Sequence, residues 1–417
     1  MGMSQVKNTM VTNLSASKLT GALPAVDGSA LTGISPFMTN ASDPAIDSNP
    51  ADGLGTVWAN TTSGEMFILT DATAGSNVWI NVGAGTGDVA PYSFGGTISG
   101  YVSGGYPNSY PSSNIIEKFS FTSDANATDV GDLAVNVDFI AGCSSSTHGY
   151  VAGGDPDLTR IERFSLTSQA NSVDIGDLAT SAYSCSGGKS STHGFVVNGP
   201  TSHSGVSSKY AFASSTSGSS HGTLTVAGYA GADASSESHV YCAGGGTARG
   251  NVIDKFATAS NADATDVGDL TNSIWYVGGN TSTTHGYCAG GFPSNNVIQK
   301  WSFSTDGNAT DVGDLVTSRR DTQGASDVTH GHNFGGYPNQ NNIEKFAFAT
   351  DGNASDVGDL SDGGDLASGV STAAYSYCVG GRDIGNMIQR WSNASANNAV
   401  DWADLTNSKS NHCSTQQ

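Results

Sequence analysis

The sequence predicts an all-β protein: a seven-bladed β-propeller preceded by a short extended N-terminal anchor and a small β module. Composition supports this class, because the 417 residues include 55 glycines and only 13% charged residues, which is typical of short strands joined by tight turns. Repetition supports the architecture, because three short markers recur seven times after residue 91. We therefore expect the anchor in 1–35, the β-hairpin module in 36–90 and the propeller in 91–417.

Three markers define the repeat. The first is an apolar stretch ending in Gly-Gly, as in Tyr-Val-Ala-Gly-Gly at 150–154, and it recurs with its pair starting at positions 104, 153, 198, 244, 290, 335 and 380. The second reads Asn-apolar-Ile-acid/amide-basic-aromatic, and its basic residue is Lys118, Arg163, Lys209, Lys255, Lys300, Lys345 or Arg390. The third is Asp-Val-Gly-Asp-Leu or a variant, and it ends at Leu133, Leu178, Leu224, Leu270, Leu315, Leu360 or Leu405.

The intervals between the markers show where the repeat varies. The Leu follows the basic residue by 15 positions in all seven copies, and the next Gly-Gly position follows the Leu by 20 in all six cases. Only the segment from Gly-Gly to the basic residue changes length, between 10 and 14 positions. Because variation confined to one loop usually marks the face that contacts partners, these loops are the predicted binding surface.

Each blade is expected to contain four strands. In one copy they are Phe139 to Ser145, a strand from Tyr150 into Gly-Gly, Arg160 to Leu166, and a strand around Leu178. The C-terminal residues 411–415 match a first strand but no Gly-Gly strand follows them, so we expect this segment to complete the sheet of the first blade. Residues 92–97 are the alternative for that place. Either arrangement would leave no open sheet edge.

The segments before the repeats are short and polar. Residues 55–68 predict a hairpin that turns at Thr62-Ser63-Gly64, and residues 77–83 predict a further strand. The segment 13–34 contains Leu-Thr-Gly twice and has too few apolar residues for a core of its own. We expect it to gain stability by packing against copies of itself or against a partner.

The markers resemble kelch-type β-propeller repeats, whose blades carry a Gly-Gly strand followed by an aromatic strand. The chain departs from kelch repeats because the regular Trp of the last strand is missing, except at Trp402. The repeat Asn-Ala-Thr-Asp-Val-Gly-Asp-Leu and the Leu-Thr-Gly segments are similar to those in fibre and other virion proteins of tailed bacteriophages. This resemblance implies a virion structural protein, a tail fibre made in the host cytoplasm, trimeric, joined to other virion proteins through its N-terminus and binding a host-surface glycan or protein through its propeller.

Two other functions stay open: a virion decoration or connector protein that binds only virion partners, and a bacterial surface lectin-like propeller. We do not expect an enzyme, because the sequence has no Gly-x-Ser-x-Gly, HExxH or phosphate-loop motif. The net charge of −21 argues against nucleic-acid binding. Membrane insertion is not expected either, since no apolar run reaches the ~18 residues of a membrane span.

The candidate binding residues lie in three variable loops. They are Tyr106, Asn108, Tyr110, Phe292, Asn295, Tyr337, Asn339 and Gln340. Aromatic rings can stack on the apolar faces of sugars while amides bond sugar hydroxyls. The alternative is that these side chains only pack the loops.

The repeated charged residues each have two interpretations. The seven basic residues form either a ring for anionic glycans or, as we expect, structural pairs with the marker Asp residues 11 or 14 positions on. The acidic turns, such as Asp306, Asn308, Asp311 and Asp314, have oxygen ligands at calcium-like spacing. Asp and Asn also cap tight turns, which is the interpretation we favour, so no cofactor is expected.

Histidine and cysteine also follow the repeat. Five histidines occupy one repeat position and are expected to stabilise turns rather than bind metal: His148, His193, His239, His285 and His330. Cys242, Cys288 and Cys378 share a position that Val fills in other copies, so they are expected to be buried. Equivalent positions in different blades are too far apart to bridge, so no disulfide is predicted.

Overall fold

The computed structural model describes residues 38–82, 96–107, 111–184, 186–197, 205–246 and 249–417. These residues form strands and no helix, and the strands form eight four-stranded sheets, so the all-β prediction is confirmed. No helix among them is long and apolar enough to cross a membrane. The chain divides into two compact units, Met1–Pro91 and Tyr92–Gln417. The expected anchor at 1–35 and the expected boundary after residue 90 lie outside the described residues.

The first unit contains one sheet in the order β1-β2-β3-β4. Its strands are β1 (Met38–Asn40), β2 (Val57–Asn60), β3 (Met66–Asp71) and β4 (Val78–Asn81). The predicted hairpin and the strand after it are present as β2, β3 and β4, while β1, which pairs parallel to β2, was not predicted. One face of the sheet holds a small core of Trp58, Phe67, Leu69 and Trp79.

The second unit contains seven sheets, each with four strands at equivalent repeat positions. The first strands are β8 (Ala141–Ser144), β12 (Ser186–Lys189), β16 (Ala232–Ser235), β20 (Gly278–Thr281), β24 (Gln323–Ser326), β28 (Ser368–Ser371) and β32 (Cys413–Gln416). The second strands are β5 (Ser99–Ser103), β9 (His148–Ala152), β13 (His193–Val197), β17 (His239–Gly245), β21 (His285–Ala289), β25 (His330–Phe334) and β29 (Tyr375–Gly381). The third strands are β6 (Ile115–Ser120), β10 (Arg160–Ser165), β14 (Val206–Ala211), β18 (Gly250–Ala257), β22 (Asn295–Ser302), β26 (Asn342–Ala347) and β30 (Gly385–Ser392). The fourth strands are β7 (Thr128–Asp132), β11 (Val173–Asp177), β15 (Ser219–Thr223), β19 (Thr265–Asp269), β23 (Thr310–Arg319), β27 (Ser355–Asp359) and β31 (Val400–Asp404).

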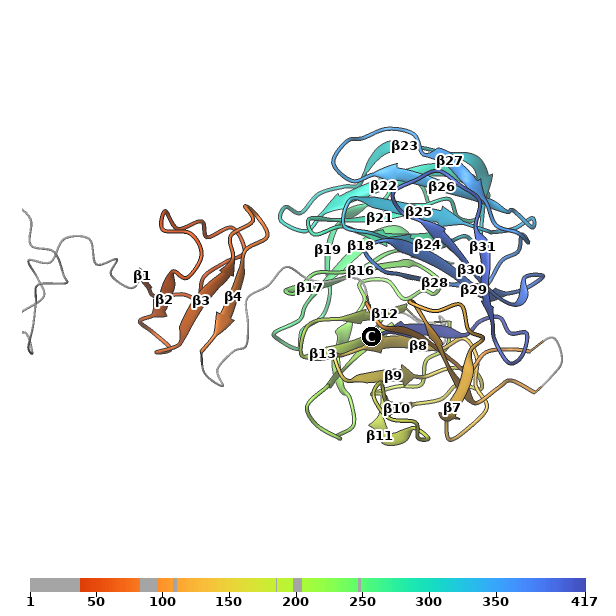
Figure 1. Cartoon of the computed structure of the whole chain (residues 1–417), viewed down its shortest axis with the longest axis horizontal. Helices are drawn as coiled ribbons and strands as arrows, with labels where there is room; N and C mark the ends of the chain where they lie inside the picture. Colours follow the sequence, from red (N-terminus) through yellow and green to blue (C-terminus); the bar gives the residue numbers. More distant parts are fainter. Residues whose placement is uncertain (1–37, 83–95, 108–110, 185, 198–204, 247–248) are drawn as a thin grey trace, which may run out of the picture. The chain divides into compact units, whose positions relative to one another are not determined.

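The seven sheets lie around a common centre. The first strands β8, β12, β16, β20, β24, β28 and β32 contact one another in this order, and β32 in turn contacts β8. Figure 1 shows β8, β12, β16, β24 and β28 toward the middle of this unit and β7, β11, β19, β23, β27 and β31 at its periphery. The C-terminal strand β32 pairs antiparallel with β5, so the end of the chain supplies the first strand of the first sheet.

Strand positions agree with the sequence except at the fourth strand. The predicted strand around Leu178 ends at Asp177, just before the Leu, and the same is true of five other copies. The Leu178 side chain is buried, and its backbone N–H still donates to the Thr159 carbonyl over 2.5 Å, so one cross-strand bond continues past the end of the strand. In the remaining copy β23 continues through Leu315 to Arg319.

An Asn or a residue of similar polarity in the turn before each fourth strand joins neighbouring sheets. The backbone N–H of Asp132 donates to Asn171 Oδ1 of the next sheet over 3.1 Å, and the N–H of Ser172 donates back to the Asp132 carbonyl over 2.9 Å. The last and first sheets are joined in the same way, because the N–H of Asp404 donates to Asn126 Oδ1 over 3.1 Å. The acidic turns therefore form hydrogen bonds between neighbouring sheets. This structural role is close to the turn-capping role that we favoured.

The acid or amide of the second marker forms another set of links between sheets. Glu162 is buried and accepts the backbone N–H of Ala134, which follows the marker Leu of the preceding sheet, over 2.8 Å. Glu117 accepts the N–H of Thr406 over 2.5 Å, which joins the last sheet to the first. The residue type at this position follows from the need for a buried acceptor.

The glycine of the third marker lies where two sheets approach closely, and Ala403 takes its place only in the last copy. Gly313 has φ +151°, and a Cβ there would lie 2.3 Å from the Gly352 carbonyl oxygen. Gly313→Ala should therefore lower the free energy of unfolding by about 3 kcal/mol, through backbone strain and overlap. Gly307→Ala is the control, since a Cβ there meets nothing within 4 Å, and it should change stability by less than about 0.5 kcal/mol. Equal losses in urea titrations of both variants would contradict this account.

The predicted partners of the basic residues were wrong. Lys255 pairs with Asp306 and Lys300 with Asp351, each over 2.5 Å, and these acids belong to the turn of the next sheet rather than to the marker of the same copy. The marker Asp instead accepts a backbone N–H two residues on, as Asp311 does from Gly313 over 3.1 Å. The within-copy prediction failed because Lys and the marker Asp are not opposite each other in the ladder: Lys300 is opposite Thr310.

The repeated histidines lie at the start of the second strands. The Nδ1 atom of His148 lies 2.8 Å from the hydroxyl of Thr147, and the four equivalent histidines make the same contact with the residue before them. This supports their predicted role in turns. Five cysteines among the described residues are buried: Cys143, Cys242, Cys288, Cys378 and Cys413. Burial raises the pKa of Cys242 to about 11 and that of Cys288 to about 12, so these thiols stay protonated and unreactive at neutral pH.

Candidate functional site

The variable loops lie at one end of the seven sheets, together with the connections that lead from one sheet to the next. Isolated bridges join the two: Phe292 of a variable loop pairs with Trp275 of a connection, and Tyr337 pairs with Arg320. The histidine turns lie at the opposite ends of the same strands. We call the end that carries the variable loops the loop face.

A ring of strained residues surrounds the centre of the loop face. Each residue lies two positions before a first strand and has φ between 48° and 54°: Phe139, Ser184, Ala230, Tyr276, Asp321, Leu366 and Asn411. Backbone hydrogen bonds link neighbours in this ring, from Asp321 N–H to the Tyr276 carbonyl over 2.8 Å and from Phe139 N–H to the Asn411 carbonyl over 2.9 Å. A left-handed conformation in residues other than glycine is costly, so it persists only where the surroundings impose it.

Aromatic side chains gather on one sector of the loop face. The rings of Trp275 and Phe292 lie 4.8 Å apart between centroids, and those of Tyr229 and Tyr276 lie 6.3 Å apart. Tyr276 and Tyr337 are exposed by 39% and 42%. We call these five residues the aromatic sector. Nearby tyrosines and Asp321 add to burial in raising the pKa of Tyr276, so its hydroxyl stays protonated and can donate a hydrogen bond.

Arg320 lies within the aromatic sector. Its guanidinium carbon is 5.0 Å from the centroid of Phe292 and 4.4 Å from that of Tyr337. Arg320 Nε, which is buried, lies 3.6 Å from Asp321 Oδ2 and has no hydrogen-bond partner among the described residues. Burial, and secondarily Asp365, raises the pKa of Asp321. The sector therefore combines exposed rings with a cation and a carboxylate whose side chains make no hydrogen bond to other described residues.

The structure brings together only some of the predicted binding residues. Phe292 and Tyr337 belong to the aromatic sector, while Tyr106 follows β5 in the loop of another sheet, 37% exposed and bridged to Ser410. Asn295 donates to the Pro293 carbonyl over 3.0 Å and accepts the N–H of Val297 over 3.2 Å, so its amide already holds its own loop.

The other predicted loop residues differ in their surroundings. Gln340 donates to the Pro338 carbonyl over 2.9 Å, as Asn295 does in its loop. Asn339 is exposed and has φ 38°, which Asn adopts more readily than most residues. Asn108 and Tyr110 lie outside the described residues.

Sequence reasoning missed Trp275, Tyr276, Arg320 and Asp321. All four lie in connections of constant length, between the marker Leu and the next Gly-Gly, so the search for variable loops passed over them. A usable signal was present: the third and second positions before each first strand hold Trp275-Tyr276 in one copy and Arg320-Asp321 in the next, so they change chemistry from copy to copy although the spacing is fixed.

The first strands enclose a central cavity of about 470 Å³. Its walls come from β8, β12, β16, β20, β24, β28 and β32 and are mostly glycine backbone and Ser or Thr hydroxyls. Two charged residues, Lys189 and Asp233, interrupt this neutral lining on neighbouring strands. Burial raises the pKa of Asp233 to about 6, so its carboxyl changes charge near neutral pH. Glycine is required in the narrow wall, since a Cβ at Gly324 would lie 2.0 Å from the Gly279 carbonyl oxygen.

His412 also borders this cavity and makes stability depend on pH. Its Nε2 lies 2.8 Å from the Ser368 hydroxyl, and burial, together with Lys409, lowers its pKa to about 3. A histidine with a lowered pKa contributes its full stability above pH ~6.5, where the unfolded imidazole is also neutral, and loses it as the pH falls toward 3.

His412→Gln should therefore flatten the dependence of unfolding free energy on pH. Between about pH 6 and 4 the wild type should lose up to about 1.4 kcal/mol per pH unit more than the variant, measured by urea titration at each pH. His148→Gln, at a partly exposed turn, is the control and should keep most of the wild-type slope. An unchanged slope in His412→Gln would show that this imidazole is not responsible.

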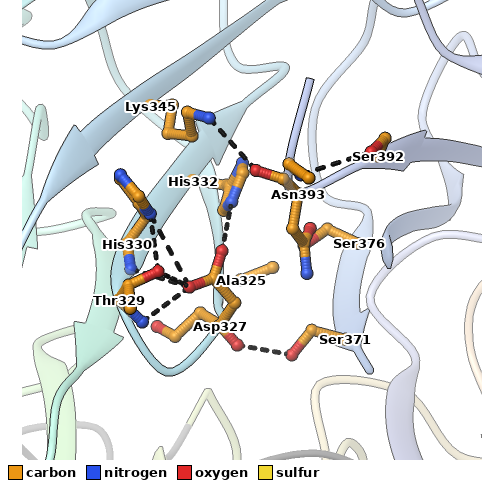
Figure 2. Close-up of polar contacts among 12 residues, drawn as sticks. Ala325, Asp327, Thr329, His330, His332, Lys345, Ser371, Ser376, Ser392 and Asn393 are labelled. Atoms are coloured by element: carbon orange, nitrogen blue, oxygen red, sulfur yellow. Dashed lines mark hydrogen bonds and ion pairs between the residues drawn. The ribbon is translucent and has the colours of Figure 1, made fainter. Parts of the chain in front are cut away.

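A second polar network lies between β24–β25 and the neighbouring sheet (Figure 2). Asp327 Oδ1 accepts the backbone N–H groups of Thr329 and His330 over 2.6 and 2.8 Å, and Oδ2 lies 3.3 Å from His332 Nε2. The indole N–H of Trp391 can only donate, and it bonds His332 Nδ1 over 3.2 Å, so Nε2 carries the hydrogen shared with Asp327.

Both ring nitrogens of His332 are therefore occupied, and the side chain is fully buried. Burial tends to raise the pKa of Asp327, but the hydrogen bonds from His332, Thr329 and His330 outweigh it and hold the pKa below its ordinary value. Although it resembles an Asp-His pair of the kind that enzymes use, this network has no free nitrogen for proton transfer. Its arrangement fits a structural role at the junction of two sheets.

Neither a metal-ligating group nor a related protein indicates what this site binds. The part of the chain that the structure describes has no group of three or more His, Cys, Asp or Glu side chains placed to hold a metal ion. No protein-family model matches the chain. A search of curated proteins gives no match either.

Proposed function

We propose that residues 92–417 form a closed seven-bladed β-propeller of the kelch-like kind. Two sets of links that run from each sheet to the next also run from the last sheet to the first, and so does a third set, made by tyrosine hydroxyls in five of the seven sheets; all three support closure. Asp404 bonds Asn126, Thr406 bonds Glu117, and the Tyr377 hydroxyl donates to the Phe121 carbonyl over 3.3 Å. The pairing of β32 with β5 adds a shared sheet to these links.

We infer that the chain is a tail fibre of a bacteriophage virion and that its loop face recognises the host surface. The observation that carries this proposal is the aromatic sector, because exposed rings beside free charged groups are typical of binding surfaces rather than of a propeller that only fills space. The resemblance of the repeats and of the Leu-Thr-Gly segments to phage virion proteins supplies the setting. Trimerisation and attachment through the N-terminal segment belong to the same proposal.

Two experiments test this function. Mass spectrometry of purified virions should find the chain as a structural component, and the purified full-length protein should bind host cells and reduce phage adsorption in competition. A chain that is present in virions but neither binds cells nor competes would indicate the decoration or connector protein instead. Its absence from virions, with the protein found on bacterial cells, would indicate the surface lectin.

A further inference from the structure

We propose that Tyr276, Arg320, Asp321 and Tyr337 form a subsite for an uncharged pyranose of a host-surface polysaccharide. This inference rests on the proposed role of the chain in host recognition and adds the chemical class of the ligand. The sequence placed the binding site in the variable loops alone. This subsite instead combines one variable loop, which carries Tyr337, with two connections of constant length, which carry Tyr276 and the Arg320–Asp321 pair.

The first argument is that Arg320 is held between two aromatic rings while part of its side chain stays exposed. Phe292 and Tyr337 cover the guanidinium, at 5.0 and 4.4 Å from their centroids, so the side chain is ordered before any ligand arrives. Its buried Nε has no hydrogen-bond partner among the described residues, and 30% of the side chain is exposed. An ordered donor with unsatisfied N–H groups loses little conformational entropy when a ligand binds.

The second argument concerns charge. Arg320 lies beside Asp321, and the nearby Arg382 pairs with Asp365 over 2.5 Å, so these two cations are balanced by two carboxylates. Asp383 adds a third carboxylate near Arg382, so an anionic ligand would gain little attraction here in a chain of net charge −21. A sugar hydroxyl both donates and accepts, so it can bond the guanidinium and the carboxylate at once.

The third argument is the stacking surface. Tyr276 and Tyr337 are exposed by 39% and 42%. Each contacts one member of the Arg320–Asp321 pair. The Asp321 N–H donates to the Tyr276 carbonyl, and the Arg320 guanidinium lies over the Tyr337 ring. The C–H face of a pyranose is apolar and suits such rings, whereas a hydrated ion does not.

The test measures binding of the full-length protein to defined oligosaccharides at 50 and 500 mM NaCl. The probes are neutral oligomers of glucose, galactose and N-acetylglucosamine, the acidic polymers polygalacturonate and polysialic acid, and polyglycerol phosphate. We expect binding to at least one neutral probe, with an affinity that changes less than about twofold between the two salt concentrations. Acidic probes alone, with affinity falling steeply with salt, would overturn the proposal of an uncharged sugar.

Two variants place the site. Tyr337→Ala removes a stacking ring, and Asp321→Asn removes the charge while keeping a residue that tolerates a left-handed backbone. Each should weaken binding of the neutral probe about tenfold or more. Tyr375→Ala is the matched control, because Tyr375 also stacks on an arginine, Arg390 at 4.3 Å, but lies at the opposite end of its strand from the loop face.

Host-cell binding by the same variants separates this inference from the proposed function. Loss of cell binding in Tyr337→Ala and Asp321→Asn but not in Tyr375→Ala would support both. If all three variants bind host cells as well as the wild type does, the proposed subsite is wrong, while the proposed role in host recognition is unaffected. A wild-type protein that binds the neutral probe through these residues but binds no host cell would support the subsite and contradict the proposed function.

Discussion

A chain shortened by residues 411–417 should lose the cooperative unfolding of the full-length protein. The deletion removes β32, whose pairing with β5 completes one sheet, and it removes the buried residues His412, Cys413 and Thr415. Exposed ladder groups and lost burial should together cost roughly 5 kcal/mol or more, which is comparable with the whole stability of many domains. Urea titration followed by circular dichroism should show a broad transition at low urea, or aggregation.

Rescue in trans provides the control for this deletion. A peptide of residues 411–417 added in excess should pair with β5 and restore part of the lost stability, because it carries the missing strand. A scrambled peptide of the same composition should have no effect. A shortened chain that unfolds like the full-length protein would contradict closure through the C-terminal strand.

Replacing Arg319 alone should have the second large effect. The Arg319 guanidinium and the Glu344 carboxylate form an ion pair with both side chains fully buried, and Arg319 also donates to the Gly335 carbonyl over 2.9 Å. Burial raises the pKa of Glu344 and lowers that of Arg319 despite their contact. Arg319→Ile leaves a buried charge without its partner, and we expect a loss of about 3–5 kcal/mol in unfolding free energy.

Another copy of the repeat has uncharged residues at the positions of this ion pair. In the neighbouring sheet the equivalent residues are Ile274 and Gln299, and Gln299 still accepts the backbone N–H of Thr271 over 2.6 Å. The double variant Arg319→Ile/Glu344→Gln copies this uncharged combination and should recover most of the lost stability.

An exposed ion pair serves as the comparison. Lys300→Met, which breaks the contact with Asp351 on the surface, should cost no more than about 1 kcal/mol. Equal losses in the Arg319 single and double variants would show that the arginine acts through packing and not through its charge.

Much of the fold could be predicted from the sequence. The three markers and their intervals identified the repeat, the position of nearly every strand and the C-terminal segment that joins the first sheet. This was possible because strand alternation, Gly-Gly turns and buried apolar positions are local patterns, and seven copies made each pattern visible above chance. The burial of the cysteines and the turn contacts of the histidines followed from the same register.

The partners of the marker residues could not be predicted in this way. Glu162 bonds a residue 28 positions earlier, Asn171 one 39 positions earlier, and Lys300 an acid 51 positions later. All three contacts cross from one sheet to the next, whereas sequence reasoning sought partners within a copy. Only the angle and spacing between packed sheets determine which side chains meet across them.

The candidate site shows the same division. Sequence composition identified Phe292 and Tyr337 as exposed loop aromatics, but nothing in their spacing placed them on the two sides of Arg320. By itself the sequence determined how many copies there are, where their strands lie and which loop varies. The tertiary structure decided which residues of neighbouring copies form one surface, because side chains far apart in the chain come together only when the sheets pack around a common centre.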